Sequence, residues 1–154
     1  MQIGFIGLGA VVETAYLPAL RRLGDVIDRC QGYDLDCSRA LPGIQRCSSL
    51  SALLAEPLDT LFITTSSLQH LPVLERALAS GISRIVVEKP IVANLEQAAR
   101  LRALLAPTEQ AARVLALDHW MARGVALNAP GPLWRGGEGG GGGGPPPPPQ
   151  QRDK

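Results

Sequence analysis

The sequence predicts a doubly wound α/β domain, a parallel sheet covered by helices on both faces. Short apolar segments rich in β-branched residues recur along the first 117 residues, and helix-like segments separate them. Strands alternating with helices of roughly 10–15 residues are typical of βαβ units with right-handed crossovers. The first apolar segment ends in Gly7-Leu8-Gly9, which suits a tight turn between a strand and a helix.

Five strands are expected along the chain, each from a short apolar run that fits a buried position in a parallel sheet. The third and fourth, TLFITT and RIVVE, are the clearest because of their β-branched residues, whereas the second is weak on its own. The expected strands are residues 2–6, 29–34, 60–65, 84–88 and 113–117.

Helices are expected between these strands. The first should present Leu17, Leu20 and Leu23 on one face, and Pro18 should kink it or mark a late start. Gly81 should end the helix expected over residues 71–80. Asn94 and Gln97 form an N-cap and capping-box pair for the helix expected over residues 95–105. The expected helices are residues 11–23, a short one capped by Ser49 or Ser51 and running to residue 55, residues 71–80 and residues 95–105.

Composition divides the chain into one domain and a tail. More than half of the glycines and prolines fall beyond residue 129, in runs that lack apolar periodicity and cannot build a core. We therefore expect a single domain over residues 1–127 and a disordered Gly/Pro-rich tail over residues 128–154.

The charge balance excludes several classes of partner. With 15 basic and 14 acidic side chains, the net charge of +1 gives no electrostatic case for nucleic acid. No apolar run reaches the roughly 18–20 residues that span a bilayer, and no secretory signal is visible. Cys30, Cys37 and Cys47 are odd in number and lack a C-x-x-C spacing. We expect reduced thiols in a cytoplasmic protein, with no metal site and no membrane or nucleic-acid partner.

The turn after the first strand is a candidate phosphate site. Gly7 would make the sharp turn, Gly9 would let a pyrophosphate approach the backbone, and the following helix would offer free N–H groups. Val12 replaces the third glycine of the G-x-G-x-x-G pattern, which governs how closely helix and strand pack. Two glycines after a strand are by themselves a weak signal, and an ordinary turn remains an equal alternative.

Asp34 strengthens the case for a dinucleotide. It lies 25 residues after Gly9, at the expected end of the second strand, near the spacing of about 20 for an acid that binds the adenosine ribose. A carboxylate there would repel a 2′-phosphate and favour NAD over NADP. The alternative is a solvated turn at residues 33–36, and the nearby Arg39 weakens the preference for NAD.

Further candidates follow the later strands. Lys89 is the only lysine of the expected domain, at the end of a strand, and unlike arginine it can release a proton to catalyse chemistry. A surface lysine is the alternative. His70 could reach a bound cofactor or simply pack at a helix start. Asp118, His119 and Trp120 could belong to a substrate pocket or form a plain strand-to-helix junction.

Together these segments resemble the glucose–fructose oxidoreductase, inositol dehydrogenase and MocA (Gfo/Idh/MocA) family of NAD(P)-dependent oxidoreductases. Glu88-Lys89-Pro90 after a strand, with a histidine-bearing helix upstream, is the most specific part of the match. The resemblance extends over about residues 2–120 and is carried by residues 3–23, 33–40 and 60–101.

The resemblance implies a Rossmann-like NAD(P)-binding domain and a role for each matching residue. Asp34 would meet the adenosine ribose, and Lys89 would contact both the nicotinamide and the reacting substrate oxygen. Glu88 would lie beside the nicotinamide. The pyrophosphate turn would be lined by Gly7, Gly9, Val11 and Val12, and the nicotinamide half would be bordered by Thr65, Ser66 and His70.

Family members typically transfer hydride to or from a sugar or polyol, and they carry a second domain that supplies substrate contacts and the oligomer interface. The resemblance fades after residue 120, so that domain is expected to be absent from these 154 residues. We therefore expect a dinucleotide-binding chain with little or no turnover alone. The alternative is a non-catalytic NAD(P)-binding sensor or a partner-docking module.

Overall fold

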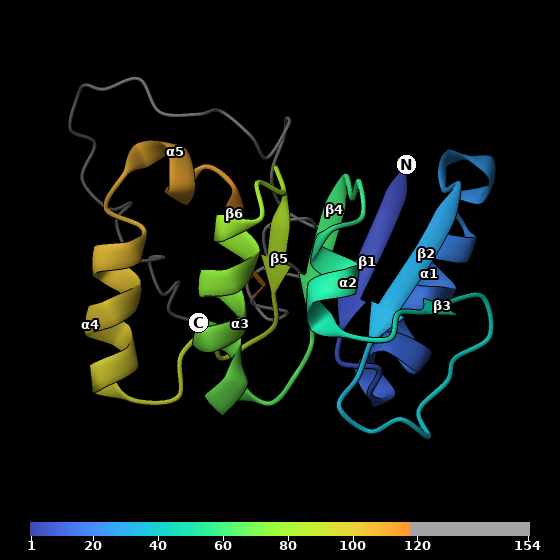
Figure 1. Cartoon of the computed structure of the whole chain (residues 1–154), viewed down its shortest axis with the longest axis horizontal. Helices are drawn as coiled ribbons and strands as arrows, with labels where there is room; N and C mark the ends of the chain where they lie inside the picture. The colour runs from blue at the N-terminus through green and yellow to red at the C-terminus, as the bar shows by residue number, and fades with distance from the viewer. Residues whose placement is uncertain (118–154) are drawn as a thin grey trace, which may run out of the picture.

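A computed structural model describes residues 1–117, which form one parallel sheet with helices on both faces (Figure 1). This confirms the doubly wound α/β prediction. The sheet has six strands in the order β3-β2-β1-β4-β5-β6. They are β1 (Gln2–Ile6), β2 (Arg29–Tyr33), β3 (Gln45–Arg46), β4 (Thr60–Ile63), β5 (Ile85–Val87) and β6 (Val114–Ala116). The Gly/Pro-rich tail and Asp118, His119 and Trp120 lie outside the described residues.

The strand order reverses beside β1. β2 lies beside β1, and β3 lies beside β2 at one edge of the sheet. The chain then crosses back, so that β4 lies on the other side of β1. Ile6 is paired with Tyr33 of β2 and with Ile63 of β4, so the carboxyl ends of these three strands are level. In doubly wound sheets, ligands bind in the crevice outside such a switch point.

Alternating side chains of the strands supply a separate apolar core to each face of the sheet. One core contains Ile6, Leu61 and Ile63 with the buried side of α3, and the other contains Ile3 and Phe5. Figure 1 shows α2 and α3 over the near face. The helical segments are η1 (Val12–Tyr16), α1 (Leu17–Arg21), η2 (Gly24–Val26), α2 (Leu50–Leu54), α3 (Ser67–Ala79), α4 (Leu95–Leu104) and α5 (Thr108–Ala111).

The first helix departs from the expected pattern. Residues Val12–Tyr16 form a π-helical segment, in which the Leu17 N–H bonds to the Val12 carbonyl five residues back. Pro18 is the second residue of α1, which begins directly after the π-helical segment. The helix ends at Arg21, so Leu23 lies beyond it and does not share a helical face with Leu17 and Leu20, and Leu23 is 52% exposed.

Helix α3 begins at Ser67, four residues before the expected start. Pro72 inside it cannot donate to the Leu68 carbonyl, which instead accepts a hydrogen bond from Gln97 Nε2 at 3.2 Å. The capping predictions for the two neighbouring helices are confirmed. Asn94 Oδ1 accepts from the Gln97 N–H, and Ser49, rather than Ser51, caps α2 through the N–H of Ala52.

Candidate functional site

A cavity of about 470 Å³ opens at the carboxyl ends of β1, β2 and β4, where the strand order reverses. One wall is apolar, from α2, α3 and β1, and the opposite rim carries charged side chains. It is lined by Ile6, Gly7, Gly9, Tyr33, Asp34, Leu35, Asp36, Arg39, Leu50, Thr64, Thr65, Ser66, Gln69, Pro72, Val73 and Arg76. A hollow of this size suits a small organic ligand or one half of a larger one.

Gly7 connects the carboxyl ends of β1, β2 and β4 through hydrogen bonds of its backbone. Its φ angle is +96°, and a Cβ at this position would lie 2.7 Å from the Thr64 carbonyl oxygen. Its N–H donates to the Tyr33 carbonyl at 2.8 Å, and its own carbonyl accepts from Thr64 Oγ1 at 2.7 Å. Only glycine combines this positive φ with so close an approach of two backbones.

Gly9 leaves room at the start of the helix. A Cβ on Gly9 would meet only Arg39 Nη1, at 3.3 Å, so the backbone here is open to the cavity. The Val12 N–H bonds back to the Gly9 carbonyl at 3.0 Å, and the Val12 side chain is fully buried in the core with Phe5 and Leu8. Val11 and Val12 are not among the residues that line the cavity, and both pack in the core that contains Phe5 and Leu8, so their place at a pyrophosphate turn stays a prediction.

Asp34 lines the cavity and also holds the glycine-rich turn. Its Oδ2 accepts from the Leu8 N–H at 2.7 Å, and its Oδ1 accepts from the Asp36 N–H at 2.9 Å. The Asp34 carboxylate therefore organises its local turn, and the residue also lines the hollow. Each carboxylate oxygen has a second lone pair, which leaves acceptor capacity for ligand hydroxyls.

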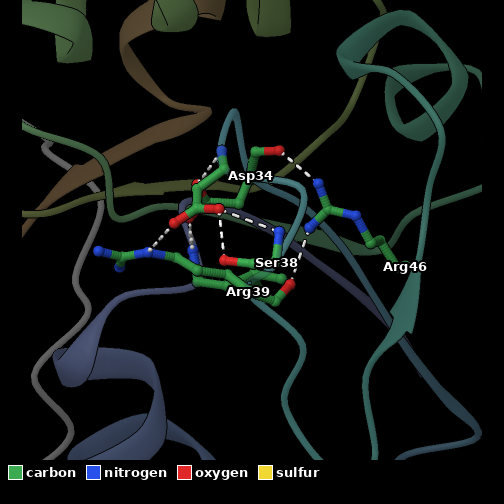
Figure 2. A network of polar contacts seen from close by, with 6 residues as sticks. Asp34, Ser38, Arg39 and Arg46 are labelled. Atoms are coloured by element: carbon green, nitrogen blue, oxygen red, sulfur yellow. Dashed lines mark hydrogen bonds and ion pairs between the residues drawn. The ribbon is translucent and has the colours of Figure 1, made fainter.

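Two arginines contact the loop after β2, which carries Asp34 and Asp36 (Figure 2). Arg46 Nη2 donates to the Asp34 carbonyl at 2.7 Å, which fixes the loop. Arg39 Nε lies 3.6 Å from Asp36 Oδ2, at the cavity rim. Hydrogen bonds from the Ser38 hydroxyl and N–H lower the pKa of Asp36, so the carboxylate that pairs with Arg39 stays anionic. The rim thus offers both a carboxylate and a guanidinium.

Thr65 and Ser66 continue the cavity beyond the end of β4, whereas His70 does not line it. The imidazole is 1% exposed, with Nε2 2.9 Å from the Thr65 carbonyl and Nδ1 2.8 Å from the Pro90 carbonyl. That His70 borders a cofactor stays a prediction, and the structure shows the imidazole packed between two backbone carbonyls. The ring lies beneath the surface and links the segment after β4 to the segment after β5.

Glu88 and Lys89 follow β5 and lie outside the cavity. Glu88 is 8% exposed, and its carboxylate accepts hydrogen bonds from the Tyr16 hydroxyl and from the Lys89 N–H. Its own N–H donates to the Ile63 carbonyl at 2.9 Å, which sets the turn level with the end of β4. Lys89 itself is exposed.

Sequence reasoning missed two parts of this site. Gln69 and Arg76 of α3 line the cavity, and Arg76 Nη2 donates to Ser51 Oγ at 3.0 Å. The helical spacing of Gln69, Pro72, Val73 and Arg76 would have revealed this face if the true start of α3 had been known. Tyr16 was missed because its partner Glu88 is 72 residues away.

The described part of the chain has neither a candidate metal site nor a helix that could cross a membrane. Residues 1–117 contain no group of three or more His, Cys, Asp or Glu side chains that could hold a metal ion. Within the same residues, no helix has the length and apolar character needed to cross a membrane. The cavity at the strand ends is therefore the candidate site that the structure presents.

Comparison with known proteins gives a consistent result. Residues 1–116 match the family model described as "Oxidoreductase family, NAD-binding Rossmann fold" (Gfo/Idh/MocA). The "Putative oxidoreductase YceM" of Salmonella typhimurium is 30% identical over 104 residues, which are 66% of this chain and 34% of that protein.

Solved structures share the fold. The UDP-N-acetylglucosamine 3-dehydrogenase GnnA of Acidithiobacillus ferrooxidans is 25% identical with a TM-score of 0.56, covering 72% of this chain and 36% of its own. An oxidoreductase structure from Klebsiella pneumoniae is 26% identical with a TM-score of 0.60, covering 76% and 34%. This chain thus spans about a third of the length of these relatives. By its fold and by the match over residues 1–116, the chain belongs to the Gfo/Idh/MocA oxidoreductase family, as its NAD-binding Rossmann domain.

Proposed function

We propose that the cavity binds the adenosine and pyrophosphate part of a nicotinamide dinucleotide. One observation supports this most directly: Gly7, Gly9 and Asp34 all line a single hollow at the switch point of the sheet. The N–H groups at the start of the helix would meet the pyrophosphate, and the Asp34 carboxylate would accept from the ribose hydroxyls. The apolar wall from Leu50 and Val73 would cover the adenine.

The nicotinamide half would extend from Thr65 and Ser66 toward Glu88 and Lys89, which follow the neighbouring strand. A bound nicotinamide supplies the hydride acceptor or donor. Lys89 would be the catalytic residue: its exposed ammonium can exchange a proton with the reacting oxygen of a substrate. For the whole protein we propose hydride transfer on a sugar or polyol hydroxyl or carbonyl, with little turnover by these 154 residues alone.

We further propose that NAD is preferred over NADP. The Asp34 carboxylate lies where a 2′-phosphate would add a second negative charge, and two like charges at close range repel. Arg39 at the same rim reduces this preference without reversing it, because its guanidinium is shared with Asp36.

Calorimetric titration of the purified chain with NADH and with NADPH tests this proposal. We expect saturable binding of NADH and weaker binding of NADPH. In Asp34→Asn the side chain keeps one acceptor for the local turn but loses its charge, so NADH should bind more weakly and the preference should shift toward NADPH. Tighter binding of NADPH by the unchanged chain would contradict the NAD preference. A folded chain that binds neither would contradict the dinucleotide site.

A second candidate function is a non-catalytic dinucleotide sensor or partner-docking module. The observation that favours it is that Glu88 and Lys89 lie outside the cavity. Turnover that depends on Lys89 separates the two functions. Turnover of a sugar or polyol that is lost in Lys89→Ala, however slow, would favour the enzyme, whereas NADH binding with no difference in turnover between the two chains would favour the sensor.

A further inference from the structure

A hydrogen bond connects the helix after the glycine-rich turn to the turn that carries Lys89. The hydroxyl of Tyr16, the last residue of η1, donates to Glu88 Oε1 at 2.5 Å. Glu88 Oε2 in turn accepts from the Lys89 N–H at 3.1 Å. The carboxylate therefore bridges a side chain that follows β1 and a backbone group that follows β5.

The Tyr16 hydroxyl is held in place by an aromatic cluster under the sheet. Its ring centroid lies 4.9 Å from that of Phe62, at an interplanar angle of 57°, and 6.1 Å from that of Phe5. Burial, and then the hydrogen bond and negative charge of Glu88, raise the pKa of Tyr16 well above its ordinary value. The phenol is thus a fixed, neutral donor aimed at one carboxylate oxygen.

The π-helical segment sets this geometry. A wider turn of five residues replaces the ordinary α-turn between Val12 and Leu17, and it ends at Tyr16. The extra residue rotates the following side chains about the helix axis, and such segments are frequent at functional sites. An ordinary α-helix from the same start would aim residue 16 in a different direction.

We propose that Tyr16 is a positioning residue, which through Glu88 fixes the turn that presents Lys89 to the nicotinamide half of the bound cofactor. This rests on the proposed dinucleotide function and extends it by naming what orients the lysine. The hydrogen bonds of His70 to Thr65 and Pro90 hold the same turn from a different helix. Loss of the Tyr16 hydroxyl should therefore loosen the turn without releasing it.

The variant Tyr16→Phe removes only the hydroxyl and keeps the ring in its cluster. In calorimetric titrations we expect NADH to bind about tenfold more weakly, the loss expected for a hydrogen bond to a charged group, while ADP-ribose keeps its affinity within about twofold. Thr14→Val is the matched control. It removes a hydroxyl from the same segment, where Thr14 Oγ1 bonds only to the Ala10 carbonyl, and both ligands should bind as before.

A second measurement needs no ligand. The chain has two lysines, Lys89 and Lys154, so selective ¹⁵N-lysine labelling yields two amide signals. Tyr16→Phe should move the Lys89 signal and leave that of Lys154 in place. An unchanged Lys89 signal, or equal losses of NADH and ADP-ribose affinity, would overturn the proposal. If the unchanged chain binds no NADH, the proposed function fails, and the lysine signal alone then decides whether Tyr16 controls the turn.

Discussion

Gly7→Ala should be the most damaging small substitution at the candidate site. The residue has φ +96°, and its new Cβ would lie 2.7 Å from the Thr64 carbonyl oxygen and 2.9 Å from the Thr65 nitrogen. An L-residue at positive φ costs roughly 1–2 kcal/mol, and forcing backbone atoms apart costs about 1–3 kcal/mol more. Alanine also makes the unfolded chain less flexible than glycine does, which stabilises the folded chain by about 0.4–1 kcal/mol. The net loss in the free energy of unfolding is therefore about 1–4.6 kcal/mol.

Urea unfolding followed by circular dichroism measures this loss. Gly43→Ala is the matched control, since Gly43 has φ +88° and a Cβ added there would meet no atom within 4 Å. Alanine at position 43 carries the same backbone strain without the contact, and it should cost no more than about 1.6 kcal/mol. Equal losses in the two variants would refute the argument that the approach of β1 to β4 requires glycine at position 7.

Two further predictions concern stability. The pKa of the Tyr16 phenol is raised in the folded chain. As the pH rises, the phenol of the unfolded chain therefore loses its proton at a lower pH than the phenol of the folded chain. The free energy of unfolding should therefore fall as pH rises above about 10, and it should fall less in Tyr16→Phe, as denaturant titrations at several pH values would show. Gln97→Glu removes the donor to the Leu68 carbonyl, which Pro72 cannot replace, and keeps an acceptor for the Ala93 N–H. We expect a loss of about 1–2 kcal/mol in urea unfolding, and no loss would mean that water satisfies this carbonyl equally well.

Much of the fold could be predicted because its signals are local. Five strands and the capped helices follow from short apolar runs and from side chains such as Asn94 that bond their own helix. β3 was missed because two residues, Gln45–Arg46, carry no periodicity. The early start of α3 was missed because Pro72 suggests a later one, and the donor that compensates for it belongs to Gln97 on another helix.

The sequence by itself determined which residue types stand at the ends of the strands. Gly7, Gly9 and Asp34 were identifiable because their roles depend on local turn geometry and on spacing along the chain, and all three line the cavity. The remaining assignments depend on packing between segments distant in sequence. Only the tertiary structure decided that Val12 faces the core and that His70 lies beneath the surface, since the burial of a side chain depends on which distant elements cover it.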